Sequence, residues 1–442
     1  MSKLRTGITL FPLTLIVVGG CIGGGIFMTP GEVAGHAPYA SLVLLLWIIG
    51  GIITLTGALT FAELGAQFPK AGGMYAYLRE AYGHWPAFLY GWTSLLAVTS
   101  GALAALSLAL SSFIALMVPM SETAQALFAI GTLIVATAIN ALGVRVGQAF
   151  TALFTSLKLL GILAIVLCGL ALYTPTHTID FSWPAFDGNL APSFLLGLVG
   201  VYWAYGGWHH VTFLSEEVVN PQRNLSRALI IGTLIVTGTY LLSNIAYLRV
   251  LPVQEIAASE TVAADMMMRA LPDLGAKLLV IIVCISIFGS IAVFTMTAPR
   301  IYFAMAGDNV FFKQMAFVHP KFRTPIFAMV LQTAWAILLL LFWKTFSDLI
   351  AYVTFTEGVF LILAAAALFI FRRRYGKSPL FRTPGYPLTP LFYILISLVF
   401  IVNGMIMKPI QGLAALILFS AGSIAYLLFR RLNRSEKPRT AK

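Results

Sequence analysis

Long apolar segments recur along the whole 442-residue chain and restrict its fold more than any other feature. Hydrophobic residues make up 59% of the sequence and charged residues 10%, which is too apolar a balance for a soluble globular protein. Segments of about 18 or more apolar residues can cross a bilayer as helices, which satisfy their own backbone groups. We therefore predict twelve transmembrane helices, at about 8–34, 39–64, 86–117, 123–141, 148–173, 191–217, 225–249, 274–305, 325–343, 347–371, 388–407 and 410–429.

The basic residues are placed asymmetrically with respect to these segments. The net charge of +12 would suit a nucleic-acid partner, but no basic patch interleaved with aromatic residues remains outside the loops. If the N-terminus is cytoplasmic, most of the 28 Lys and Arg residues fall in cytoplasmic loops and in the tail after Leu428. This is the positive-inside pattern. We predict that both termini are cytoplasmic and expect no nucleic-acid partner.

Two glycine clusters interrupt apolar segments, Gly23-Gly24-Gly25 near the start of the chain and Gly206-Gly207 near its middle. Each glycine in a helix interior costs roughly 1 kcal/mol relative to alanine, so the first cluster disfavours helix by about 3 kcal/mol. Unwound backbone is tolerated in a membrane only where it is buried in protein or lines a cavity. A matched pair of broken helices is a sequence sign of a transporter site near the midplane. The alternative for the first cluster is a small-residue packing face between helices.

The two breaks divide the chain into comparable halves. Residues 1–173 hold five predicted spans and residues 191–371 hold five more, each half beginning with a broken helix. An odd number of spans per half makes the second half enter from the opposite side, so the halves are candidates for an inverted repeat. We predict a scaffold role for the two helices of 388–429, a cytoplasmic tail at 430–442, and short helices within an outward loop at 251–273.

Other functional classes lack support in the sequence. Cys21, Cys168 and Cys284 lie in apolar segments and are predicted to be buried thiols rather than a disulfide framework. The first apolar segment is too long for a signal peptide and lacks a clear cleavage site, so we expect it to be retained. The chain has no HExxH, phosphate-loop or GxSxG motif. We expect no enzyme activity, no cofactor and no metal.

Several motifs resemble a known group of transporters. Ile22-Gly23-Gly24-Gly25-Ile26-Phe27 resembles the unwound first helix of the amino acid–polyamine–organocation (APC) superfamily. Ala204-Tyr205-Gly206-Gly207-Trp208 with Glu216-Glu217-Val218 is similar to the sixth-helix region of the L-amino-acid transporter (LAT) family. Further matching motifs are Phe61-Ala62-Glu63-Leu64-Gly65, Pro69-Lys70-Ala71-Gly72-Gly73, Asn220-Pro221, Arg223-Asn224, Gly289-Ser290 and His319-Pro320.

The resemblance covers nearly the whole chain and has direct implications. It implies an all-α membrane protein with a LeuT-type 5+5 inverted repeat, unwound first and sixth helices, and amino-acid substrates. It also indicates a bacterial member, in the inner membrane. The heavy subunits of animal relatives are not expected here, because no cysteine lies in an outward loop to anchor one. Gly24 departs from the family, in which serine is usual, and this removes a hydroxyl beside the expected carboxylate site.

The broken helices suggest how a zwitterion would bind. The free amides at the start of the second half-helix would bind its carboxylate, and unwound carbonyls at the second break would accept from its ammonium. The predicted substrate-binding residues are Ile22, Gly23, Gly24, Gly25, Ile26, Trp203, Ala204, Tyr205, Gly206 and His209. By resemblance Trp203 is also the gate over bound substrate, with ordinary packing as the alternative. A purely structural role for His209 is left open.

Charged residues inside the membrane segments suggest the remaining roles. Lys158 lies within the fifth predicted helix, where by resemblance a lysine stands in for the sodium ion of related transporters, with Tyr240 nearby. Snorkelling to the cytoplasmic face is the alternative. Glu357 has no obvious partner and is left open between a functional and a structural role. Glu63 and Glu216/Glu217 are predicted to pair with loop arginines as an inner gate.

These observations predict a secondary amino-acid transporter that works by alternating access. Sodium-independent exchange of neutral L-amino acids is favoured, because neither glycine break carries a carboxylate to neutralise a cationic side chain. Proton-coupled symport and antiport of cationic amino acids or polyamines remain alternatives. A membrane receptor or enzyme would leave the two helix breaks unexplained. The exact substrate and the oligomeric state do not follow from the sequence.

Overall fold

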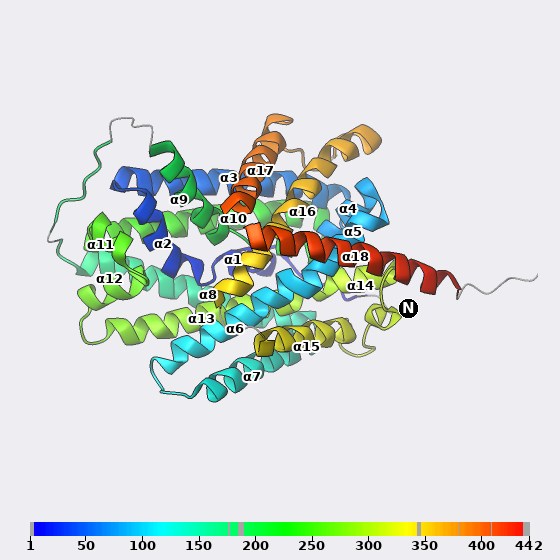
Figure 1. The fold of residues 1–442 in the computed structure, drawn as a ribbon, viewed down its shortest axis with the longest axis horizontal. Coiled ribbons are helices and arrows are strands. Elements are labelled where there is room, and N and C mark those ends of the chain that lie inside the picture. The colour runs from blue at the N-terminus through cyan, green and yellow to red at the C-terminus, as the bar shows by residue number, and fades with distance from the viewer. Residues whose placement is uncertain are drawn as a thin grey trace, which may run out of the picture.

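The computed structural model describes residues 4–175, 177–183, 190–342, 346–378, 380–407 and 409–435. Within these residues the fold is all-helical, apart from one isolated parallel bridge between Ile8 and Val218. Most of the long helices run roughly along the long axis of the molecule, and shorter ones lie toward its ends (Figure 1). The prediction of an all-α protein is confirmed.

The helices follow the expected order. The first half contains α1 (Leu10–Cys21), α2 (Gly25–His36), α3 (Ala40–Gln67), α4 (Met74–Tyr82), α5 (His84–Thr93), η1 (Ser94–Val98), α6 (Thr99–Ala115), α7 (Glu122–Ala141), α8 (Val144–Leu167) and η2 (Cys168–Leu172). The second contains α9 (Leu190–Ala204), η3 (Trp208–Glu217), α10 (Pro221–Val250), α11 (Val253–Ala258), α12 (Val262–Ala270), α13 (Gly275–Thr297), α14 (Pro299–Gly307), η4 (Lys313–Ala316), α15 (Ile326–Phe342) and α16 (Phe346–Tyr375). Two further helices, α17 (Leu388–Met407) and α18 (Pro409–Ser435), follow. The short helices α11 and α12 occupy the predicted outward loop.

Many of these helices have the length and composition of membrane spans. Among the described residues, seven segments qualify: Ala40–Gln67, His84–Ala115, Glu122–Ala141, Val144–Leu172, Pro221–Val250, Gly275–Gly307 and Gly412–Arg431. The bent pair of α1 and α2 would make an eighth if it is one span. The other predicted spans fall on α9, α15, α16 and α17. The chain thus has the helices of a multi-pass membrane protein.

Both predicted glycine breaks interrupt helices. The axes of α1 and α2 differ by 46° across residues 22–24. In the second half α9 ends at Ala204, a turn follows, and the chain continues as the 3₁₀ helix η3. Gly207 in this turn has φ +93°, a left-handed conformation that favours glycine. The prediction of two interrupted helices is therefore confirmed.

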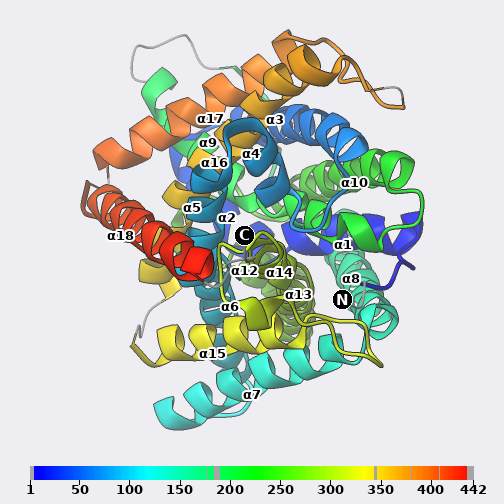
Figure 2. The same cartoon turned by 90° about the vertical axis from the view of Figure 1, so that its right-hand side faces the viewer.

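Helix α1 lies at the centre of the bundle. Its residues from Leu13 to Cys21 are all buried, as expected for a helix that is apolar on every side. It packs against α8, α10, α13 and η3, and Figure 2 shows it between α10 and α8. A Cβ on Gly19 would lie 2.5 Å from Thr155 Oγ1, and one on Gly20 would lie 2.8 Å from the Gly207 carbonyl oxygen. Small residues therefore permit close packing here, just before the break itself.

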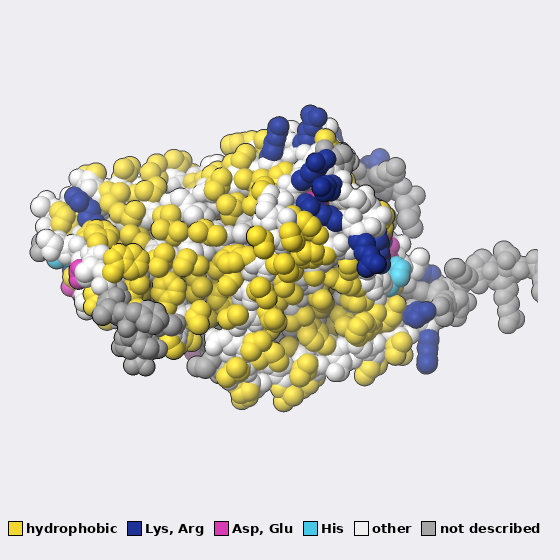
Figure 3. Space-filling view, turned by 90° about the horizontal axis from the view of Figure 1, so that it is seen from above, with side chains coloured by type: hydrophobic (Ala, Val, Ile, Leu, Met, Phe, Trp, Pro, Cys, Tyr) yellow, Lys and Arg dark blue, Asp and Glu magenta, His cyan; other side chains and the backbone are white. Residues whose placement is uncertain are grey.

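The surface separates apolar and basic regions. Hydrophobic side chains cover the middle of the face seen in Figure 3, while Lys and Arg side chains gather mainly at one end. That end is the one where Figure 1 places the N-terminus and α14. An apolar band with basic residues concentrated at one end is the arrangement from which a cytoplasmic side is inferred.

Candidate functional site

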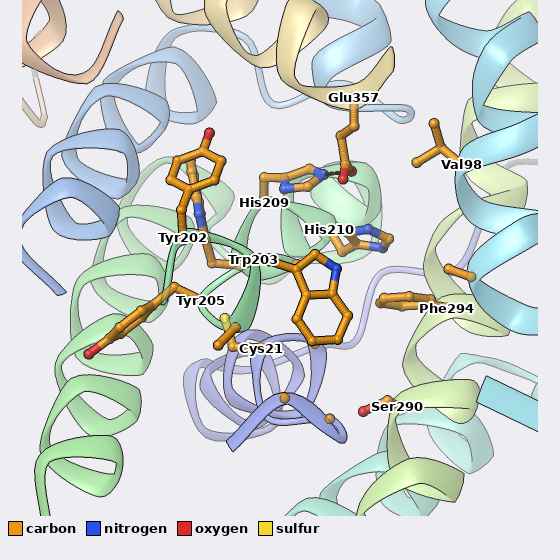
Figure 4. A pocket seen from close by; sticks show the side chains of 18 of the residues that line it. Cys21, Val98, Tyr202, Trp203, Tyr205, His209, His210, Ser290, Phe294 and Glu357 are labelled. Carbon is orange, nitrogen blue, oxygen red and sulfur yellow. Dashed lines mark ion pairs between the residues drawn. The ribbon is translucent and has the colours of Figure 1, made fainter. Parts of the chain in front are cut away.

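A cavity lies where the two helix breaks meet (Figure 4). The first break contributes Gly23, Gly24 and Gly25 to its wall, and the second contributes the run from Tyr202 to His210. The rest of the wall comes from the end of α1 and from α3, η1, α6, α13, α16 and α17. The breaks also touch directly, because a Cβ on Gly207 would lie 2.4 Å from the Gly20 carbonyl oxygen.

The first break leaves the start of α2 uncapped. Gly24 occupies the N-cap position, and no side chain there hydrogen-bonds to the helix. The first amides of a helix have no carbonyl one turn earlier to bond to, so they carry partial positive charge and attract anions. A Cβ on Gly24 would meet no atom within 4 Å. Gly24 therefore borders open space in the wall.

The carbonyl groups of the second break are partly occupied. The Trp203 carbonyl accepts a 2.9 Å hydrogen bond from the Gly206 amide. The Ala204 carbonyl accepts a 2.9 Å bond from the Tyr240 hydroxyl. These two carbonyls of the second break thus already have one partner each. Since a carbonyl oxygen has two lone pairs, each can still accept a second bond.

Lys158 on α8 is fully buried and reaches the first break. Its Nζ donates to the Gly19 carbonyl over 3.2 Å, to the Ile22 carbonyl, and to Ser290 Oγ over 3.1 Å. An ammonium has three donors, and all three are satisfied here. The prediction that Lys158 joins the fifth helix to the unwound segment is confirmed, and the snorkelling alternative is wrong, because the side chain points into the bundle.

Tyr240 on α10 connects the two breaks. Its hydroxyl lies 3.1 Å from the Cys21 carbonyl oxygen and 2.9 Å from that of Ala204. The single hydroxyl proton is thus shared between the last carbonyl of α1 and the last carbonyl of α9. The predicted proximity of Tyr240 to the site is confirmed, and its contact with the second break was not foreseen.

The predicted substrate-binding residues take different positions. Gly23, Gly24, Gly25 and the whole run from Trp203 to Gly206 line the cavity, as does His209. The Trp203 ring faces the first break, where one of its carbons would be 3.3 Å from a Cβ on Gly25. Tyr205 points its hydroxyl away, toward the Trp47 carbonyl 3.0 Å distant. The side chains of Ile22 and Ile26 are fully buried and do not line the cavity.

An ionisable cluster occupies the wall opposite the first break. His209 Nε2 lies 3.0 Å from Glu357 Oε1, and the adjacent His210 stacks on Phe294 (Figure 4). Glu357 therefore has a partner, which its position in the sequence did not reveal. It also places a carboxylate in the cavity wall. Neither glycine break carries a carboxylate, as the sequence indicated, but Glu357 of α16 places one in the same cavity within reach of a cationic substrate.

The predicted inner gate corresponds to buried ion pairs at the basic end of the molecule. Arg300 donates to both carboxylate oxygens of Glu217 over 2.7 and 3.0 Å, and both side chains are buried. Arg372 makes the same kind of pair with Glu63, over 2.8 and 2.7 Å. The predicted pairing is confirmed for Glu63 and Glu217. Glu216 instead is exposed.

Further polar contacts at this end of the bundle involve Thr383 and the pair Arg79–Asp308. The Thr383 amide also donates to Glu63, over 2.7 Å. Arg79 pairs with Asp308, which accepts a 2.8 Å hydrogen bond from the Tyr75 hydroxyl as well. Residues from α3, α4, η3, α14 and α16 are thereby linked at one end of the bundle.

Comparison with known proteins places this cavity in a family. A family model described as amino acid permease matches residues 8–428. The serine/threonine exchanger SteT of Bacillus subtilis (strain 168) is 33% identical over 390 residues, which is 87% of each chain. The chain is an amino acid permease of the LAT family. Mouse b(0,+)-type amino acid transporter 1 is 30% identical over 97% of this permease and 88% of its own length. Mouse large neutral amino acids transporter small subunit 2 is 32% identical over 85% and 72%.

Family membership settles the general class of activity. The permease is a multi-pass membrane protein that transports amino acids, and it is not an enzyme. Sequence reasoning had missed several members of the cavity wall, among them Thr99, Phe294 and Tyr393. Each lies in an apolar helix, and no motif or charged residue next to it in the sequence indicates a role in a binding site. Glu357 did carry such an indication, because a carboxylate inside a membrane segment is costly and needs a role.

Proposed function

We propose that this permease is a sodium-independent exchanger of neutral L-amino acids that works by alternating access. In this proposal residues 1–173 and 191–371 are the two inverted five-helix repeats of a twelve-span LeuT-type fold. Residues 388–429 serve as a scaffold and 430–442 as a cytoplasmic tail. The protein resides in a bacterial inner membrane with both termini in the cytoplasm, and it requires no heavy subunit.

The contacts of Lys158 carry the sodium-independent part of the proposal. Its ammonium already bonds two carbonyls of the first break and a hydroxyl of α13. A fixed ammonium that donates to these carbonyls can hold the unwound backbone in place, as a bound cation would. The break therefore needs no imported ion to hold its shape.

The arrangement of backbone groups supports an amino-acid zwitterion as the substrate. The uncapped start of α2 offers amides to a carboxylate. The turn that follows α9 offers the Gly206 carbonyl, together with the second lone pairs of Trp203 and Ala204, to an ammonium. Both features face the same cavity, so one molecule can engage both. The names of the relatives, a serine/threonine exchanger and a large neutral amino acids transporter subunit, support neutral substrates.

Glu357 supports a second candidate, exchange of cationic amino acids. Its carboxylate lies in the cavity wall and is partly exposed, so a lysine-like or polyamine-like ammonium can approach it. His209 already lies beside this carboxylate and competes with such a substrate. Neutral substrates therefore remain the first choice. Proton-coupled symport is the remaining alternative, since a fixed Lys158 is compatible with either mode.

Transport by the purified permease in proteoliposomes tests the proposal. Uptake of radiolabelled serine should require unlabelled amino acid inside the vesicles and should be unchanged when choline replaces sodium. Competition by excess leucine but not by lysine or putrescine would support neutral substrates. Uptake that collapses without sodium, or that is driven by a pH gradient into empty vesicles, would refute sodium-independent exchange. Strong competition by lysine would select the cationic alternative.

A further inference from the structure

Three side chains with metal-binding chemistry meet in the cavity wall. His209 and His210 lie in the first turn of η3, and Glu357 comes from α16 (Figure 4). One ligand atom from each lies within 4.8 Å of the corresponding atoms of the other two. Two imidazoles and a carboxylate form a donor set used by Zn²⁺ sites that keep a fourth position open. All three residues line the cavity.

The hydrogen bonds of His210 favour the neutral tautomer that leaves one ring nitrogen free to bind a metal. Thr297 Oγ1 donates its only proton to the Val293 carbonyl over 2.8 Å. The 3.2 Å contact between Thr297 Oγ1 and His210 Nδ1 must then be donated by the imidazole. Nδ1 therefore carries the proton of the neutral ring, and Nε2 keeps its lone pair. Metal-binding histidines characteristically donate their other ring N–H to a fixed acceptor in this way.

The ring of His209 lacks the hydrogen bonds that burial normally demands. Its side chain is 2% exposed, and neither ring nitrogen makes an aligned hydrogen bond within the described residues. Although Nε2 lies 3.0 Å from Glu357 Oε1, the approach angle does not satisfy hydrogen-bond geometry. Among the described residues, Nδ1 of this buried ring therefore has no hydrogen-bond partner and Nε2 has only a poorly aligned ion pair, which leaves the imidazole with unused capacity to bind a ligand.

We propose that His209, His210 and Glu357 bind one divalent transition-metal ion of the Zn²⁺ class, and that the bound ion blocks transport. The proposal goes beyond amino-acid exchange, which needs no metal. Closing the present spacing to metal–ligand distances of about 2.0–2.2 Å requires only that the three side chains draw together. Imidazole-rich sites favour Zn²⁺, Ni²⁺ and Cu²⁺ over the oxygen-preferring Mg²⁺ and Ca²⁺. A simple ion pair between His209 and Glu357 is the competing explanation.

Metal binding by the purified full-length permease separates these explanations. Titration calorimetry with Zn²⁺ should show one site per chain, and Mg²⁺ should not compete. Replacing a ligand, as in Glu357→Gln or His210→Ala, should weaken binding by at least about tenfold. The matched control is His84→Gln, which removes an exposed histidine far from the cavity wall and should bind as the wild type does. Absence of a stoichiometric site, or equal binding by all variants, would overturn the proposal.

Two measurements do not depend on the folding of any variant. Co²⁺ added to wild-type protein should give the visible absorption of a tetrahedral site, and Zn²⁺ should abolish it. In proteoliposomes Zn²⁺ should raise the apparent KM for amino-acid uptake, and EDTA should reverse this. Binding without any effect on uptake would show that the ion does not sit in the transport cavity. Because binding is measured without transport, its failure is distinguishable from failure of the proposed exchange activity.

Discussion

Neighbouring glycines in the first break differ sharply in the space around them. A Cβ on Gly25 would lie 3.2 Å from Ala204 Cα and 3.3 Å from the Trp203 ring, whereas one on Gly24 would meet nothing within 4 Å. Gly24 is the N-cap of α2 and Gly25 is its first residue, so both lie at the same helix end and their position in the chain does not explain the difference. Gly25 allows the two breaks to approach, and Gly24 contributes open cavity wall.

This difference predicts opposite outcomes for two adjacent substitutions. Gly25→Val should push the second break away and lower amino-acid affinity by at least about tenfold, because overpacking costs roughly 1–3 kcal/mol. Gly24→Ser, which adds a small hydroxyl-bearing side chain where a Cβ meets no atom, should retain binding. Equilibrium binding of radiolabelled serine to purified protein measures both. Unchanged affinity in Gly25→Val would mean that the cavity is not the binding site, and equal loss in both variants would mean that the open space at Gly24 does not tolerate a side chain.

Lys158 permits a second test at the level of one residue. Lys158→Met keeps most of the side-chain volume but removes every donor, so the carbonyls of Gly19 and Ile22 are left to share the single hydroxyl proton of Ser290, which cannot satisfy both at once. Each unsatisfied buried acceptor costs about 1–3 kcal/mol, so exchange should fall by more than about tenfold. Uptake by wild type and variant is compared with sodium and with choline outside. Normal uptake by the variant would remove Lys158 from the mechanism.

Among the elements, the ends of α1 and α9 are held by one hydroxyl. Tyr240 lies within hydrogen-bond distance of the last carbonyl of each helix, Cys21 and Ala204. Tyr240→Phe keeps the ring and removes this link, so stability should fall by only about 1 kcal/mol while exchange slows markedly. Thermal unfolding and uptake rates on the same preparation separate the two effects. A variant with unchanged exchange would show that the breaks move independently of this contact.

Trp203, at the end of α9, permits a kinetic test. Trp203→Ala should reduce the exchange rate more than it reduces equilibrium binding, because a lid acts on occlusion and commitment rather than on the bound state. Serine binding and serine exchange are measured side by side. Parallel losses in both would assign Trp203 to packing alone.

For the whole molecule, ion pairs between distant segments close one end of the bundle. Glu217→Gln would leave the buried Arg300 without a charged partner, which costs roughly 3–5 kcal/mol. Its neighbour Glu216 is exposed, so Glu216→Gln should be nearly neutral. Thermal unfolding in detergent compares the two. If both variants unfold like the wild type, the pair is not part of the closure.

The sequence predicted the elements far better than their contacts. Apolar length and the glycine clusters indicated the helices and both breaks, since these depend on local composition. The sequence predicted that Glu63 and Glu217 pair with arginines but not with which ones, because Arg372 and Arg300 come from distant segments. The pairing of Glu357 with His209 was missed for the same reason. Ile22 and Ile26 were placed in the site by motif, yet their side chains turn into the protein core.

The backbone contact between Gly20 and Gly207 restricts how this permease can be altered in the laboratory. A side chain at either position would overlap a carbonyl oxygen of the other segment, and backbone cannot move aside as a flexible side chain can. Neither position can be replaced alone, and replacing both only adds to the overlap. Directed evolution toward new substrates should therefore recover changes at Gly24, where the wall is open, while randomised libraries at positions 20 and 207 return glycine.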